Sequence, residues 1–198
     1  MTGWYEATAY KSEFCSEMRA LYAGPLVYVD VDAFVHANYE PYFQSLAAKQ
    51  YDFGAHWFQG PAGGYDKTRN DDRMLSGTLF FGDTAGARQL LAAWCEINAA
   101  MKRSGCRQGG GQKNLWFTTT CFPLKIAKLP GRYCYVFDKP WAYPKDEPRI
   151  IEHLIASRIH RDSIKKTPDV ISSASQAKLS RSRQLDAQLL PQAKKRKP

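Results

Sequence analysis

The sequence predicts an α/β fold in which helices flank a mixed, partly parallel sheet. Two helical periodicities alternate with three short apolar runs, in the order helix, strand, strand, helix, strand. This alternation is typical of layered α/β domains. A length of 198 residues suits one domain with an appendage, and a hydrophobic content of 44% allows a packed core.

The first predicted helix covers residues 10–24 and ends at Gly24-Pro25, since glycine followed by proline stops a helix. Its apolar positions share one face, which we expect to be buried. They are Phe14, Met18, Leu21 and Tyr22. The next segment, LVYVD (26–30), is apolar at consecutive positions, as in a strand that is covered on both faces.

A second strand is predicted over residues 74–83, interrupted at Gly77, and a third over residues 133–138. Between them Thr84 can cap a helix that ends at Gly105. Apolar residues recur along this helix at steps of three and four, at Ala87, Leu90, Leu91, Trp94, Ile97 and Met101.

We expect residues 1–160 to form the domain and residues 161–198 to form a basic, mostly disordered tail. Residues 159–198 hold ten basic and three acidic side chains, a balance of +7, whereas the rest of the chain is close to neutral. From Lys165 onward there is no aromatic residue and little apolar periodicity, so few contacts can offset the entropy of ordering. A short helix around Gln176–Leu190 is the alternative. The ending, Lys194–Lys197, suits nucleic-acid binding, a nuclear address or simple solubility.

The sequence disfavours membrane proteins, secreted proteins and proteins built on disulfides or zinc. No apolar stretch approaches the roughly 20 residues of a membrane span, and no secretory signal opens the chain. The five cysteines are scattered without a C-x-x-C pair, which argues against a disulfide framework or a zinc site. These features predict a cytoplasmic protein with free thiols and no membrane partner.

Two carboxylates, Asp30 and Asp32, stand at the carboxyl end of the first predicted strand. Open α/β sheets bind ligands at that end, and strand residues two apart point to the same side. Two neighbouring carboxylates repel each other unless a cation or a proton lies between them. Mg²⁺ or Mn²⁺ with a phosphate as further ligand would satisfy both. The alternative is that one aspartate caps a turn and the other is solvated.

Seven segments in order extend this pattern over most of the chain: AYKSEFCSEMRAL, LVYVDVDAFV, YEPYFQSL, LSGTLFFGDTAGARQLLAAWCEIN, GGGQKNLW, KLPGRYCYVFD and RIIEHLIASR. From about Trp4 to Arg158 they resemble the nucleotide-diphospho-sugar transferases, which are glycosyltransferases of the GT-A type. Haloacid-dehalogenase-like phosphatases and translesion polymerases share the D-x-D strand, but they match only locally. The resemblance implies a GT-A-like mixed sheet.

The resemblance also implies roles for particular residues. Asp30 and Asp32 would hold Mn²⁺ or Mg²⁺ on the donor diphosphate, and His153 would be the third metal ligand, with a structural histidine as the alternative. The implied donor-binding residues are Lys11, Ser76, Gly77, Thr78, Gln112 and Arg158. For Lys11 and Arg158 the alternative is a surface charge, and for residues 76–78 it is a β-bulge.

Two departures from the family pattern stand out. Gly111 precedes Gln112 where the family usually has an aspartate, so the catalytic group is unknown. The candidates for it are Asp71, Asp72 and Gln112, with Glu96 as a further acid nearby. Only 29 residues precede Asp30, fewer than one βαβ unit takes. We therefore expect an N-terminally shortened fold that lacks the first strands and the nucleotide-binding part. Three explanations stay open: a truncated product, half of a split enzyme whose N-terminal half is a separate chain, or a family member with an unusual donor site.

The function implied is metal-dependent transfer of a sugar from a nucleotide-diphosphate donor to a hydroxyl group. Compact members of the family include bacteriophage enzymes thought to glycosylate hydroxymethylated bases in DNA, and a basic tail suits that acceptor. In that case the protein would work in the host cytoplasm. Two alternatives are a truncated or split remnant that binds without turnover, and a basic DNA-interaction protein whose two aspartates are incidental.

Overall fold

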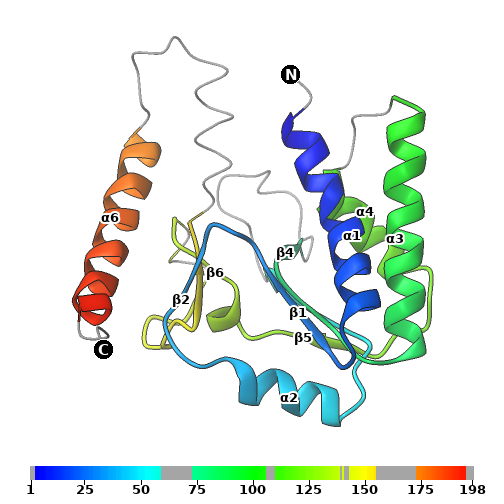
Figure 1. Cartoon of the computed structure of the whole chain (residues 1–198), viewed down its shortest axis with the longest axis horizontal. Coiled ribbons are helices and arrows are strands. Elements are labelled where there is room, and N and C mark those ends of the chain that lie inside the picture. The colour runs from blue at the N-terminus through cyan, green and yellow to red at the C-terminus, as the bar shows by residue number, and fades with distance from the viewer. Residues whose placement is uncertain are drawn as a thin grey trace.

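The computed structural model of the protein describes residues 3–58, 73–105, 110–138, 140, 143–154 and 173–194. These residues form two mixed sheets with helices around them, which confirms the predicted α/β class (Figure 1). Among them no helix combines the length and the apolar character needed to cross a membrane. The cysteines that the structure describes, Cys15, Cys95, Cys121 and Cys134, are free thiols, as expected.

The larger sheet has four strands in the order β1-β4-β3-β5. Strand β4 pairs antiparallel with both neighbours, whereas β3 and β5 are parallel. The strands are β1 (Leu26–Val29), β3 (Phe53–Phe58), β4 (Arg73–Phe81) and β5 (Ile126–Lys128). Strand β1 lies at an edge and its four residues are half-buried, so the expectation of a strand covered on both faces fits β4 better.

The smaller sheet has three strands in the order β2-β7-β6, with β7 antiparallel to β2 and parallel to β6. They are β2 (Ala33–Val35), β6 (Tyr135–Val136) and β7 (Ile151–His153). The predicted third strand therefore shrinks to two residues, because the 3₁₀ helix η1 (Gly131–Tyr133) takes its start. The chain passes from the larger to the smaller sheet between β1 and β2.

Two apolar cores lie on opposite faces of the larger sheet, and β4 contributes to both. Leu79 and Phe81 face one core and Phe80 the other, as strand alternation requires. The first core lies against α1 (Gly3–Leu21), α3 (Ala85–Arg103) and α4 (Gly110–Thr119), which gather on one side in Figure 1. The second lies against α2 (Glu40–Ala48).

Helix α3 confirms the prediction from periodicity. Thr84 is its N-cap: the hydroxyl accepts from the backbone N–H of Ala87 at 3.1 Å and donates to Asp52 at 2.6 Å. Trp94 is fully buried and Leu91 is 2% exposed.

Helix α1 corrects the prediction of its buried face. Phe14, Leu21 and Tyr22 are 38%, 70% and 66% exposed, whereas Ser12 and Cys15 are fully buried. Ser12 lies inside because Asn98 of α3 donates to its hydroxyl at 2.8 Å, and Asn114 of α4 donates to Asn98 at 2.7 Å. These polar contacts join the three helices in addition to the apolar core that they share.

The C-terminal segment also differs from what the sequence suggests. Where mostly disordered chain was expected, the structure forms helix α6 (Ser173–Lys194), which includes the alternative helix around Gln176–Leu190. Leu185 is 1% exposed and Arg181 binds Glu152 of β7, so tertiary contacts support the helix. The expected boundary near residue 160 lies outside the described residues, and so do residues 195–197 of the basic ending.

Candidate metal centre

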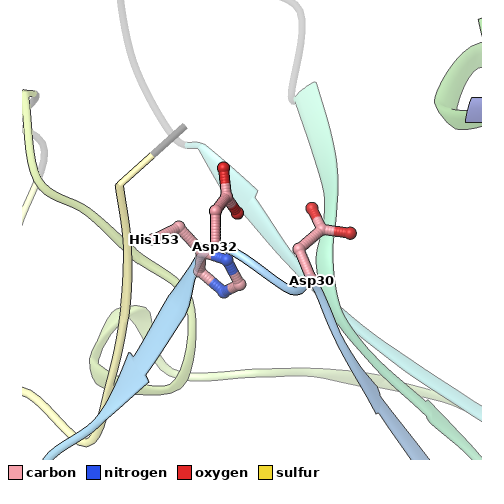
Figure 2. A group of neighbouring side chains, drawn as sticks. All are labelled: Asp30, Asp32 and His153. Atoms are coloured by element: carbon pink, nitrogen blue, oxygen red, sulfur yellow. The ribbon is translucent and has the colours of Figure 1, made fainter. Parts of the chain in front are cut away.

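The structure brings Asp30, Asp32 and His153 together. One ligand atom from each lies within 4.8 Å of the others, and Figure 2 shows the three side chains next to one another. Asp30 follows β1, Asp32 precedes β2, and His153 ends β7. The cluster therefore forms at the point where the chain crosses between the two sheets.

The aspartates are neighbours for a different reason from the predicted one. They do not alternate along a strand; they occupy the turn between two strands that belong to different sheets. Backbone hydrogen bonds hold this turn: Asp30 N–H donates to the Gly77 carbonyl at 2.8 Å, and Leu154 N–H donates to the Asp32 carbonyl at 3.1 Å. Val31 between them is fully exposed.

His153 offers one ring nitrogen to this cluster. Its Nε2 lies 2.9 Å from the Thr78 hydroxyl, whereas its Nδ1 is buried without a hydrogen-bond partner in the part of the chain that the structure describes. If Nε2–H donates to Thr78, the lone pair of Nδ1 stays free, as in histidines that bind metals. Burial lowers the pKa of the His153 ring, and the negative charges of Asp30 and Asp32, which would raise it, do not outweigh this effect. The ring is therefore neutral at neutral pH.

Gly77 makes room for the His153 ring. A Cβ atom at position 77 would lie 2.8 Å from Cε1 and 2.9 Å from Nδ1 of that ring, which is closer than real contacts allow. Pairing between β3 and β4 shifts at this point, since Ala55 opposes Leu79 but His56 opposes Leu75. Residues 76–78 thus form the β-bulge that was the alternative for this segment.

Lys11 lies in the site and is not a surface charge. Its Nζ lies 2.7 Å from Asp30 Oδ1 and donates to the Ser76 carbonyl at 2.9 Å, and its side chain is 12% exposed. It also lies 4.9 Å above the ring of Tyr28, whose hydroxyl donates to the same Asp30 oxygen at 2.9 Å. Tyr28 was missed in the sequence, although its place two residues before Asp30 on a strand could have indicated it.

Gln112, at the start of α4, reaches the same bulge. Its Oε1 accepts from the backbone N–H and the hydroxyl of Ser76, both at 3.3 Å. Gly111 is held by Trp94, whose indole N–H donates to its carbonyl at 2.9 Å. Ser76 therefore joins Lys11 and Gln112, while Thr78 contacts His153.

The other predicted residues are not in this group. Asp71, Asp72 and Arg158 lie outside the described residues, and Glu96 is exposed on α3. The charge of the cluster is that of two carboxylates and one ammonium, with a neutral histidine. An imidazole nitrogen together with carboxylate oxygens suits a divalent cation such as Mn²⁺.

Comparison with known proteins gives similarity in structure but not in sequence. No protein-family model and no curated protein matches the chain. The glycosyltransferase GlyE from Streptococcus pneumoniae TIGR4 aligns with 94% of this chain at 13% identity and a TM-score of 0.51. The chain spans 45% of the length of GlyE. The galactosyltransferase LgtC was solved with donor and acceptor sugar analogues. The alignment with LgtC covers 87% of this chain and 69% of the LgtC chain, at 11% identity. Its TM-score of 0.45 does not establish a shared fold. The comparison with GlyE shows a fold found in a glycosyltransferase.

Proposed function

We propose that this protein transfers a sugar from a nucleotide-diphosphate donor to a hydroxyl acceptor, with Mn²⁺ or Mg²⁺ as cofactor. The observation that supports it is the cluster of Asp30, Asp32 and His153 in a chain with the fold of a glycosyltransferase. The cluster fits a cation because the His153 Nδ1 atom is buried without a hydrogen-bond partner among the described residues, and one ligand atom of each of the three residues lies within 4.8 Å of the others. A cation held there would neutralise the charge that builds on the leaving diphosphate.

The residues around the cluster suit a donor that carries phosphate and sugar groups. The ammonium of Lys11, held by Asp30 and Ser76, places a positive charge next to the cluster, which favours a ligand that carries phosphate. The amide of Gln112 and the hydroxyl of Ser76 offer hydrogen bonds of the kind that sugar hydroxyls make. Thr78 keeps the His153 ring in one orientation. The sequence resemblance alone keeps Arg158 as a donor-binding candidate. The catalytic group stays unknown, with Asp71, Asp72 and Gln112 as the candidates.

The acceptor remains a proposal based on charge. A hydroxymethylated base in DNA would suit the basic C-terminal segment. Not every cation there is available, because Lys178 is 3% exposed and Arg181 binds Glu152. Exposed Arg183 and the lysines at the end of the chain would have to provide the phosphate contacts.

Calorimetric titration with UDP and GDP, with and without Mn²⁺, tests the donor site. We expect binding that depends on Mn²⁺, is lost in Asp32→Ala, and is unchanged in Asp146→Ala, which removes an exposed aspartate. Asp32 is the target because replacing Asp30 would also remove the contacts with Lys11 and Tyr28. Absence of binding, or binding that ignores Mn²⁺, would contradict the proposal and favour the remnant without turnover, which the glycine at position 111 also suggests.

The affinity for Mn²⁺ should depend on pH through His153. A protonated imidazole cannot bind a metal, and burial lowers the pKa of this ring below the ordinary value of about 6.5. We therefore expect constant affinity from about pH 8 to about pH 6.5, and a decline only as the pH falls further. Titration of Mn²⁺ followed by electron paramagnetic resonance measures this. A decline that already begins above pH 7 would show that His153 is not the titrating ligand.

A further inference from the structure

Glu152, the residue before His153, is a buried carboxylate that contacts two arginines and a histidine. It is fully buried, and Arg181 of α6 binds it through both oxygens, at 3.1 Å from Nε to Oε1 and 2.7 Å from Nη2 to Oε2. His36 Nε2 lies 2.7 Å from Oε2, and Arg149 donates to Oε1 at 3.3 Å. A two-pronged arginine contact of this kind fixes the geometry of the carboxylate.

Glu152 and His153 are adjacent on β7, the central strand of the smaller sheet. Their side chains therefore point to opposite faces: His153 toward Gly77 and Thr78 of β4, and Glu152 toward α6. On β2 they oppose Phe34 and Ala33, and the His153 carbonyl accepts from Phe137 at 3.2 Å. Because the two residues are neighbours in one strand, contacts that hold the backbone of Glu152 also hold the backbone of His153.

Helix α6 is anchored to this sheet at more than one position. Lys178 lies 3.9 Å from Asp138, just after β6, and Leu185 is 1% exposed. In Figure 1 the helix lies at the end of the molecule with β2 and β6, across from α1, α3 and α4. Its described contacts with Glu152 and Asp138 thus act on the sheet that provides His153.

We propose that α6 clamps β7 and that Arg181 is a positioning residue for the proposed metal ligand His153. Through Glu152, Arg181 keeps the His153 ring against Gly77 and next to the two aspartates. The C-terminal basic segment is then part of the metal centre, in addition to any role in binding an acceptor. This inference rests on the metal site of the proposed function.

The affinity for Mn²⁺, measured well below the unfolding temperature, tests the clamp. Arg181→Ala should weaken binding about 10-fold or more, as loss of groups that orient metal ligands typically does. Arg181→Lys should recover part of it, since an ammonium lacks the two-pronged contact. Asp186→Ala, which removes an exposed charged side chain of the same helix, should leave the Mn²⁺ affinity unchanged. In the His153→Ala background, Arg181→Ala should cause no further loss, whereas a merely structural effect would persist.

Hydrogen exchange gives a readout that needs no metal. Arg181→Ala should speed exchange at the amides of Phe137 and Leu154, which donate to the carbonyls of His153 and Asp32, and leave the β1–β4 pairing unchanged. Unchanged exchange at these two amides, or full Mn²⁺ affinity in Arg181→Ala, would overturn the clamp. The metal centre would still stand in that case if Asp32→Ala abolishes Mn²⁺ binding. Failure of the unmodified protein to bind Mn²⁺ would overturn both.

Discussion

Replacing Arg181 with alanine is expected to lower the free energy of unfolding by about 3 kcal/mol. The reason is that Glu152 is fully buried, so the variant leaves a carboxylate inside the protein without its two-pronged partner. Arg149 and His36 remain, which places the cost near the lower end for broken buried pairs. Urea unfolding at neutral pH measures the change, with Arg183→Ala as the matched control at about 0.5 kcal/mol or less.

Replacing the other partner, Glu152, should lower the free energy of unfolding by less. Glu152→Gln removes the buried charge itself, and the side chains that lose their partner, Arg181 and Arg149, are 19% and 41% exposed and can be hydrated. A larger loss in Glu152→Gln than in Arg181→Ala would contradict this explanation of the cluster.

The same cluster predicts a dependence on acid. Burial raises the pKa of Glu152, but the hydrogen bonds from Arg181 and His36 outweigh it and leave the pKa below its ordinary value. Because the folded-state pKa is the lower one, the carboxylate stabilises the fold above about pH 4.3, and this contribution is lost as the pH falls through the folded-state value. Glu152→Gln should remove that part of the acid dependence.

Replacing Gly77 with alanine is expected to cost about 1–3 kcal/mol of stability and most of the Mn²⁺ affinity. The added Cβ would lie 2.8 Å from the His153 ring, which is 3% exposed and has little space to move. The backbone at position 77 needs no left-handed conformation, so the effect comes from the contact alone. Urea unfolding and Mn²⁺ titration of the same sample separate the two losses.

A double-mutant cycle decides whether the contact is the cause. In the His153→Ala background the ring is gone, so Gly77→Ala should be close to neutral for stability, with a coupling of about 1–2 kcal/mol between the positions. Equal costs in both backgrounds would show that residue 77 is constrained by the bulge and not by His153.

Local sequence signals predicted those parts of the fold whose cause is local. Helix α3 has a threonine cap and apolar residues at helical spacing, and both act within a few residues of one another. Asp30 was placed at the end of a strand because the four apolar residues before it need no distant partner to be recognised. Strands of three residues, such as β2 and β7, carry too little periodicity to be found in this way.

Periodicity misled where polar contacts decide which side of a helix is buried. The apolar stripe of α1 faces outward because Ser12 completes a hydrogen-bonded seam with Asn98 and Asn114. The polar composition of the tail suggested disorder because the partner that supports α6, Glu152, lies far away in the sequence. In both cases the free energy comes from groups that a local pattern cannot contain.

The sequence alone therefore predicted the α/β class, helix α3, and the three residues that could bind a cation. Only the tertiary structure decided that Asp30, Asp32 and His153 meet, that Gly77 makes space for the ring, and that Lys11 pairs with Asp30. The physical reason is that propensities and strand or helix periods act between near neighbours in the chain. The site depends instead on where two sheets adjoin, and that is set by packing and hydrogen bonds between distant segments.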